Sequence, residues 1–123
     1  MYNQGALAYQ KTAQQTADPR SLEASLLARS AAHLQQIRET WPERFDELEE
    51  ALNKNRKIWS IFLQSVTKDD HPLPAPVRQN VANLGIFVMG QTYEILASKD
   101  PAKLDAIINI NRQISAGLRG NGG

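Results

Sequence analysis

The sequence contains no cysteine in its 123 residues. Disulfide bonds, thiolate metal ligands and a thiol nucleophile are therefore excluded. Long hydrophobic runs are also missing, because no apolar stretch approaches the roughly 20 residues that cross a bilayer. The opening "MYNQGALAYQKTAQQ" lacks the apolar segment that is typical of a secretory signal. We therefore expect a cytoplasmic protein with no membrane span.

A strong charge of one sign is absent as well. Lysine and arginine number 14 and aspartate and glutamate 13, which gives a net charge of +1. An extended nucleic-acid surface normally carries a marked basic bias, so the composition argues against direct nucleic-acid binding. A hydrophobic content of 41% with well-mixed charges fits a single folded domain, which we expect to span residues 1–123.

Recognisable catalytic motifs are missing. The chain has no phosphate loop, no GxGxxG, no GxSxG and no HExxH. The stretch "DDH" at Asp69–His71 brings two carboxylates near an imidazole, but its spacing matches no strong zinc pattern. The other histidine, His33, falls on a helical stripe and is expected in the core or at its boundary. We therefore expect no enzyme, no cofactor and no metal site.

Helical periodicity is what the sequence does contain, almost throughout. It predicts an all-α bundle of four main helices plus a short N-terminal helix within residues 1–17 and a disordered tail at 119–123. We expect the main helices to run from the Asp18 cap to about Trp41, from Pro42 to about Val66, from Pro76 to about Ser98, and from the Asp100 cap to about Leu118.

Apolar residues at spacings of three and four predict the buried face of each helix. In the first main helix the predicted stripe is Leu22, Leu26, Ser30, His33, Ile37 and Trp41. In the second it is Phe45, Leu48, Leu52, Asn55, Trp59, Phe62 and Val66. In the last it is Leu104, Ile107, Ile108, Asn111, Ile114 and Leu118. Asn55 and Asn111 interrupt these stripes, and we expect each to be a hydrogen-bonded tie between helices.

The segment 76–98 is different, because it is apolar on nearly every side. Val77, Val81, Leu84 and Val88 form one stripe, and Ile86, Met89, Tyr93 and Leu96 form another. Gly85 and Gly90 leave low spots where a second helix can come close, and packing inside the domain is the preferred interpretation. The three later helices together have more apolar faces than a four-helix core needs, which favours a partner surface or a homodimer.

Several stretches, taken in order, resemble the FlaF family of bacterial flagellar proteins. The resemblance rests on an Asn-x-x-Ile-Trp element, on a Leu-Pro before the apolar helix, and on a final Ile-Asn-Arg-x-Ile-x-x-Gly-Leu. The stretches are "SLEASLLARSAAHL" (Ser21–Leu34), "NRKIWSIFLQSV" (Asn55–Val66), "LPAPVRQNVANLGIFVMGQTYEI" (Leu73–Ile95) and "LDAIININRQISAGL" (Leu104–Leu118).

The resemblance implies a small cytoplasmic helical protein that is needed for flagellin to be made and exported. It implies flagellin as the partner, bound as by a secretion chaperone, and FlbT, a translational repressor of flagellin, as a second associated protein. Flagellin termini are amphipathic helices that stay unpaired until the filament assembles, and an apolar groove would suit them. The residues expected to line that groove are Trp59, Phe62, Ile86, Phe87, Met89, Tyr93, Ile110 and Ile114.

A second hypothesis is a regulator that acts on flagellin mRNA or on the FlbT-type repressor bound to it. The basic stretch "NKNRK" (Asn53–Lys57), with Arg112 and Arg119, would then supply the contacts. A solvated helix face is the simpler interpretation of that stretch.

Overall fold

The computed structural model describes residues 19–120, which form four α-helices and no strand. The helices are α2 (Pro19–Glu39), α3 (Leu48–Val66), α4 (Ala75–Ser98) and α5 (Leu104–Leu118), with 3₁₀ turns at Phe45–Glu47 and Pro101–Lys103. The predicted all-α fold is confirmed. Within this part of the chain, no helix combines the length and apolar content needed to span a membrane.

The structure describes none of the predicted N-terminal helix and only part of the predicted C-terminal tail. The N-terminal helix expected within residues 1–17 lies outside residues 19–120, as does its neighbour Asp18. Of the tail expected to be disordered, Arg119 and Gly120 form hydrogen-bonded turns, with their N–H groups donating to Ser115 O (3.1 Å) and Gly117 O (3.0 Å). The remaining residues, 121–123, are not described.

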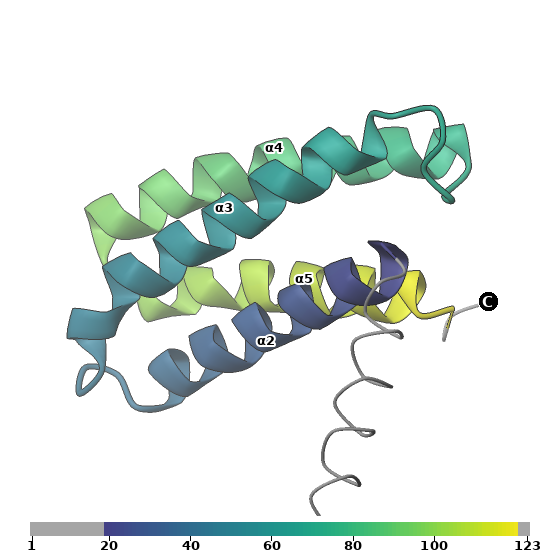
Figure 1. Ribbon diagram of the computed structural model, residues 1–123. Helices are drawn as coiled ribbons and strands as arrows, with labels where there is room; N and C mark the ends of the chain where they lie inside the picture. Colours follow the sequence, from purple (N-terminus) through teal and green to yellow (C-terminus); the bar gives the residue numbers. More distant parts are fainter. Residues whose placement is uncertain (1–18, 121–123) are drawn as a thin grey trace, which may run out of the picture.

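Successive helices run antiparallel, so the bundle has an up-down-up-down topology (Figure 1). The helices α3 and α4 form one pair and α2 and α5 form the other. The most extensive packing lies within these two pairs, and α2 also packs on α3. The contact between α4 and α5 is much smaller. As a result, α4 is the helix with the least of its surface covered by neighbours.

The helix predicted to begin at Pro42 begins at Leu48. The segment between α2 and α3 is held by bonds between residues three apart, including Phe45 N–H to Pro42 O at 3.0 Å and Glu47 N–H to Arg44 O at 2.9 Å. Such bonds make turns and 3₁₀ geometry rather than an α-helix. Asp100 acts as a cap as predicted, since its side chain accepts a hydrogen bond from Ala102 N–H at 3.0 Å, but the turn that it caps is the 3₁₀ segment Pro101–Lys103, and α5 begins after it at Leu104.

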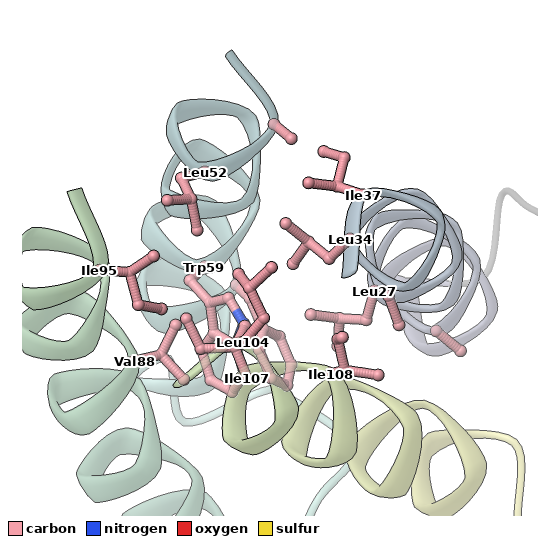
Figure 2. Close-up of a cluster of buried hydrophobic side chains, with 14 of the residues drawn as sticks. Leu27, Leu34, Ile37, Leu52, Trp59, Val88, Ile95, Leu104, Ile107 and Ile108 are labelled. Carbon is pink, nitrogen blue, oxygen red and sulfur yellow. The ribbon is translucent and has the colours of Figure 1, made fainter. Parts of the chain in front are cut away.

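The core is centred on α3, whose predicted stripe is confirmed except that Phe45 is only partly buried. Trp59 is fully buried. Figure 2 shows this ring among side chains that come from the other three helices. These are Leu27 and Leu34 from α2, Val88 and Ile95 from α4, and Leu104, Ile107 and Ile108 from α5.

The predicted face of α2 is partly wrong. The residues that α2 buries most deeply are Ala24, Leu27, Ala31, Leu34 and Ile37. Of the predicted stripe, Ser30 and Ile37 are buried, Leu22 is 44% exposed, and His33 is partly buried, at the boundary of the core as expected. This face is buried because it contains the small residues Ala24 and Ala31, which let a neighbouring helix come close. At Ala24 that neighbour is α5, since the Ser115 hydroxyl donates to Ala24 O at 2.7 Å.

In α4 the first predicted stripe is partly right, because Val81 and Val88 are buried whereas Val77 is 41% exposed, and in the second stripe Ile86 and Tyr93 are exposed. The buried face is Val81, Gly85, Val88, Thr92 and Ile95. A Cβ atom at Gly85 would lie 2.6 Å from Leu63 Cδ2, so this glycine lets α4 pack directly on α3. The interpretation of close packing within the domain is thus confirmed for Gly85. At Gly90 a Cβ atom would meet nothing within 4 Å.

A buried hydrogen-bond network joins α2, α3 and α5. Asn55 Oδ1 accepts from Ser30 Oγ (2.8 Å) and from Asn111 Nδ2 (2.8 Å). Asn111 Oδ1 accepts from Trp59 Nε1 at 2.8 Å. The predicted role of both asparagines as ties between helices is confirmed. The network does not include α4, whose buried Thr92 hydroxyl donates to its own helix at Val88 O.

Candidate interaction surface

Two of the eight residues expected to line a partner groove lie in the core. Trp59 and Phe62 are 0% and 1% exposed, and their rings meet edge to face with centroids 5.5 Å apart. Side chains of α2, α4 and α5 surround Trp59 (Figure 2), and the Trp59 N–H is used inside the network. These two side chains therefore stabilise the bundle and present no surface to a partner.

Three others are well exposed, and all three belong to α4. Ile86 is 68% exposed, Tyr93 61% and Phe87 46%. Met89 and, on α5, Ile110 and Ile114 are partly buried against the core. Large apolar side chains that remain in water on one helix mark a surface that another molecule can cover.

The structure divides these α4 residues between two edges of the helix. Ile86, Met89 and Tyr93 are three, four and seven residues apart, so they share one edge. Met89 and Tyr93 border side chains of α3, which identifies that edge as the one beside α3. Phe87 follows Ile86 by about 100° around the helix and lies away from it. The expected residues therefore do not form one continuous surface.

Along the edge beside α3, three hollows follow one another between the two helices. The first, of about 420 Å³, lies between Phe45 and Leu96. The second, of about 300 Å³, is lined by Arg56, Lys57, Ser60, Met89 and Tyr93. The third, of about 250 Å³, is lined by Val66, Thr67, Ala75, Arg78, Gln79 and Ala82. Because α3 and α4 are antiparallel, these residues succeed each other along the pair. We call the row of hollows the α3–α4 groove.

Arginine side chains connect the two helices at two points of the α3–α4 groove. In the middle, Arg56 Nη1 donates to the Tyr93 hydroxyl at 3.2 Å. At the far end, Arg78 donates to three carbonyl oxygens, those of Leu73 (3.1 Å), Val66 (3.0 Å) and Lys68 (2.9 Å). Arg78 therefore satisfies the end of α3 and fixes the following loop.

The charge of α3 changes sign along the groove. Asp46 and Glu49 line the first hollow, whereas Arg56 and Lys57 line the second. On the solvent side of α4, Lys103 Nζ lies 2.7 Å from Glu94 Oε1. This hydrogen bond and the lysine charge lower the pKa of Glu94 below its ordinary value.

The loop before α4 contains a buried histidine–carboxylate hydrogen bond that the sequence analysis did not anticipate. His71 Nε2 lies 3.1 Å from Glu23 Oε1 of α2, and the two side chains are 2% and 10% exposed. The Leu73 N–H donates to His71 Nδ1 at 3.2 Å, which leaves the ring proton on Nε2, facing Glu23. The pair ties the loop to α2. No metal-binding group of histidines and carboxylates was found within residues 19–120.

The basic stretch Asn53–Lys57 does not form a uniformly positive surface. Lys54 and Lys57 border a hollow that Asp46, Glu49 and Glu50 also line. The acidic side chains lower the positive potential that a phosphate backbone would meet.

Comparison with known families decides the family. The sequence model described as "Flagellar protein FlaF" matches residues 6–118, which is nearly the whole chain. The chain belongs to the FlaF family. The resemblance seen in the sequence is thereby confirmed, and this FlaF-family chain is a flagellar protein. Comparison with curated proteins gave no match, and comparison with solved structures gave none.

Proposed function

We propose that this FlaF-family protein is a cytoplasmic, non-catalytic chaperone that binds flagellin and promotes its synthesis and export. Membership of a family of flagellar proteins supports a role in building the flagellum. The resemblance described above suggests flagellin as the partner. The proposal adds that binding takes place through an apolar helical surface.

The observation that carries the proposal is the exposure of Ile86, Tyr93 and Phe87 on a single helix. A helix of a four-helix bundle normally directs such residues inward and polar residues outward. The apolar surface left on α4 is suited to receive the apolar stripe of an amphipathic helix. An unassembled flagellin terminus is a helix of this kind.

A regulator that contacts flagellin mRNA is less well supported. The lysines that would bind phosphate share their surface with Asp46, Glu49 and Glu50. A protein that neutralises several phosphates binds much more weakly as salt rises, whereas burial of apolar surface responds little. Association with a FlbT-type repressor remains compatible with flagellin binding, because the two partners need not use one surface.

The test is calorimetric titration of the purified chain with flagellin monomer, at two salt concentrations and several temperatures. We expect saturable binding with a negative heat-capacity change, the mark of apolar burial, and a shallow dependence on salt. A failure to bind flagellin would overturn the proposal. Sedimentation of the free chain over a range of concentrations tests whether the exposed face of α4 instead closes a homodimer.

A further inference from the structure

We propose that the α3–α4 groove holds one helix of the partner, with its apolar residues against α4 and an acidic residue facing Arg56 and Lys57. This inference rests on the proposed function, since it takes the bound helix to be part of flagellin. It adds where the helix lies and which charge it presents.

The shape of the α3–α4 groove suits a helix. Its three hollows extend along α3, whose 19 residues span about 28 Å at 1.5 Å per residue. A partner helix of about 18 residues would therefore fill it. The second and third hollows are lined in part by small side chains, Ser60, Ala75 and Ala82, over which another helix can approach closely.

The two banks of the α3–α4 groove differ in chemistry. On the α4 bank, Met89 and Tyr93 line the second hollow, and Ile86 lies one turn before Met89 on the same edge without lining a hollow; Ile86 and Tyr93 are more than half exposed. The α3 bank carries Arg56 and Lys57 at the same level as Met89 and Tyr93. A helix resting between the banks would need an apolar stripe on one side and polar or charged residues beside it.

The charges select an acidic residue at the middle of the partner helix. Arg56 donates one N–H to the Tyr93 hydroxyl, and its guanidinium has further donors that can meet a carboxylate. Lys57 is exposed next to it. The first hollow is lined by Asp46 and Glu49 and by one cation, Lys99, so it attracts a carboxylate less than the second hollow, where Arg56 and Lys57 face no acidic lining residue. A difference in charge of this kind fixes the register of a bound helix.

Phe87 lies outside all three hollows, which makes it a useful contrast. A second contrast is Ile61 of α3, which is 63% exposed against 61% for Tyr93 but, unlike Tyr93, lines none of the hollows. Tyr93→Ser and Ile61→Ser therefore form a matched pair. Both side chains are mostly in water in the free protein, so neither change should unfold the bundle, and circular dichroism checks this.

The experiment titrates flagellin monomer into the full chain carrying these changes. We expect Tyr93→Ser, in the middle hollow, to weaken binding by about tenfold, as for a central interface residue, and Ile61→Ser by less than about twofold. The double variant Arg56→Gln and Lys57→Gln should weaken binding at low salt and flatten the salt dependence that the wild type retains. The matched double variant Arg29→Gln and Arg112→Gln, at exposed sites of α2 and α5, should leave the affinity for flagellin and its salt dependence unchanged.

Each outcome decides between the two proposals. Flagellin binding that is lost with the α3–α4 groove variants and kept with the controls supports both. Flagellin binding that is unchanged by Tyr93→Ser and by the Arg56 and Lys57 changes overturns the placement in the groove, while the chaperone proposal stands. Absence of flagellin binding by the wild type overturns the chaperone proposal, and the placement with it.

Discussion

Replacing Asn111 with alanine tests the buried network directly. The Asn111 amide accepts from Trp59 Nε1 and donates to Asn55 Oδ1, both at 2.8 Å, and the residue is fully buried. An alanine would leave the Trp59 N–H without an acceptor, at a cost of about 1–3 kcal/mol. Loss of the hydrogen bond to Asn55 adds about 1 kcal/mol. We therefore expect the free energy of unfolding to fall by about 3 kcal/mol.

The assay is urea unfolding followed by circular dichroism of the helices. At a slope of about 1.5 kcal/mol/M, the expected loss lowers the midpoint by about 2 M. The matched control is Asn109→Ala, two residues away in α5 but exposed, where Gln113 Nε2 donates to Asn109 Oδ1 at 3.3 Å. A surface change of this kind is expected to stay within about 0.5 kcal/mol.

A double-mutant cycle separates the hydrogen bond from general packing. In a Trp59→Phe background no indole N–H remains to be left unpaired, so Asn111→Ala should cost less there than in the wild type. Equal costs in the two backgrounds, or a cost as small as that of Asn109→Ala, would refute the reasoning. The network would then contribute nothing that packing alone does not supply.

Three further changes test local features of the fold. Gly90→Ala should stabilise the chain by roughly 0.5–1 kcal/mol, because nothing lies near the added methyl group. Gly85→Ala should destabilise it by about 1 kcal/mol, because the added Cβ atom would press into Leu63 of α3. Equal effects of the two changes in urea unfolding would contradict the close packing at Gly85. His71→Ala should lower the free energy of unfolding by about 2–3 kcal/mol in the same assay, because the buried Glu23 carboxylate of α2 would lose its hydrogen-bond partner. A loss below about 1 kcal/mol would contradict this reason. In a carbon-detected NMR titration the pKa of Glu94 should lie below its ordinary value and return towards it in Lys103→Ala. The pair's contribution to stability is therefore present above the ordinary glutamate pKa and lost as the pH falls through the lowered one; an unchanged titration in the variant would contradict the assigned cause.

The sequence predicts the fold well where one face of a helix is clearly apolar. In α3 the large residues recur at three and four along one stripe for the whole length of the helix, so the buried stripe could be read directly although Ile61 lies outside it. The Asp100 cap was predictable for a similar reason, since its side chain acts on the adjacent backbone. Asn55 and Asn111 were predictable as ties because a buried amide needs a partner.

The sequence is ambiguous where two faces compete. In α2, leucines occur on both candidate faces, and the choice depends on the small residues Ala24 and Ala31 that admit α5. In α4, apolar residues surround the helix, so the pattern could not show that Gly85 and Thr92 are buried while Ile86 is exposed. Such outcomes depend on neighbouring helices, which a single helical stripe does not describe.

The candidate surface was predictable in part. A surplus of apolar residues indicated that some part of α4 would stay exposed, and it does. The sequence could not separate Trp59 and Phe62, which fill the core, from Ile86 and Tyr93, which do not. The pairing of the basic middle of α3 with the apolar edge of α4 required the antiparallel packing of the two helices.

Site-specific photo-crosslinking with flagellin tests the central claim most directly. A photoreactive side chain replaces Tyr93 in one sample and Ile61 in a second, and each is irradiated with flagellin monomer. We predict a crosslink from position 93 to a terminal flagellin helix, close to an acidic residue, and little from position 61. Equal crosslinking from both positions, or crosslinking from position 61 alone, would contradict binding in the α3–α4 groove.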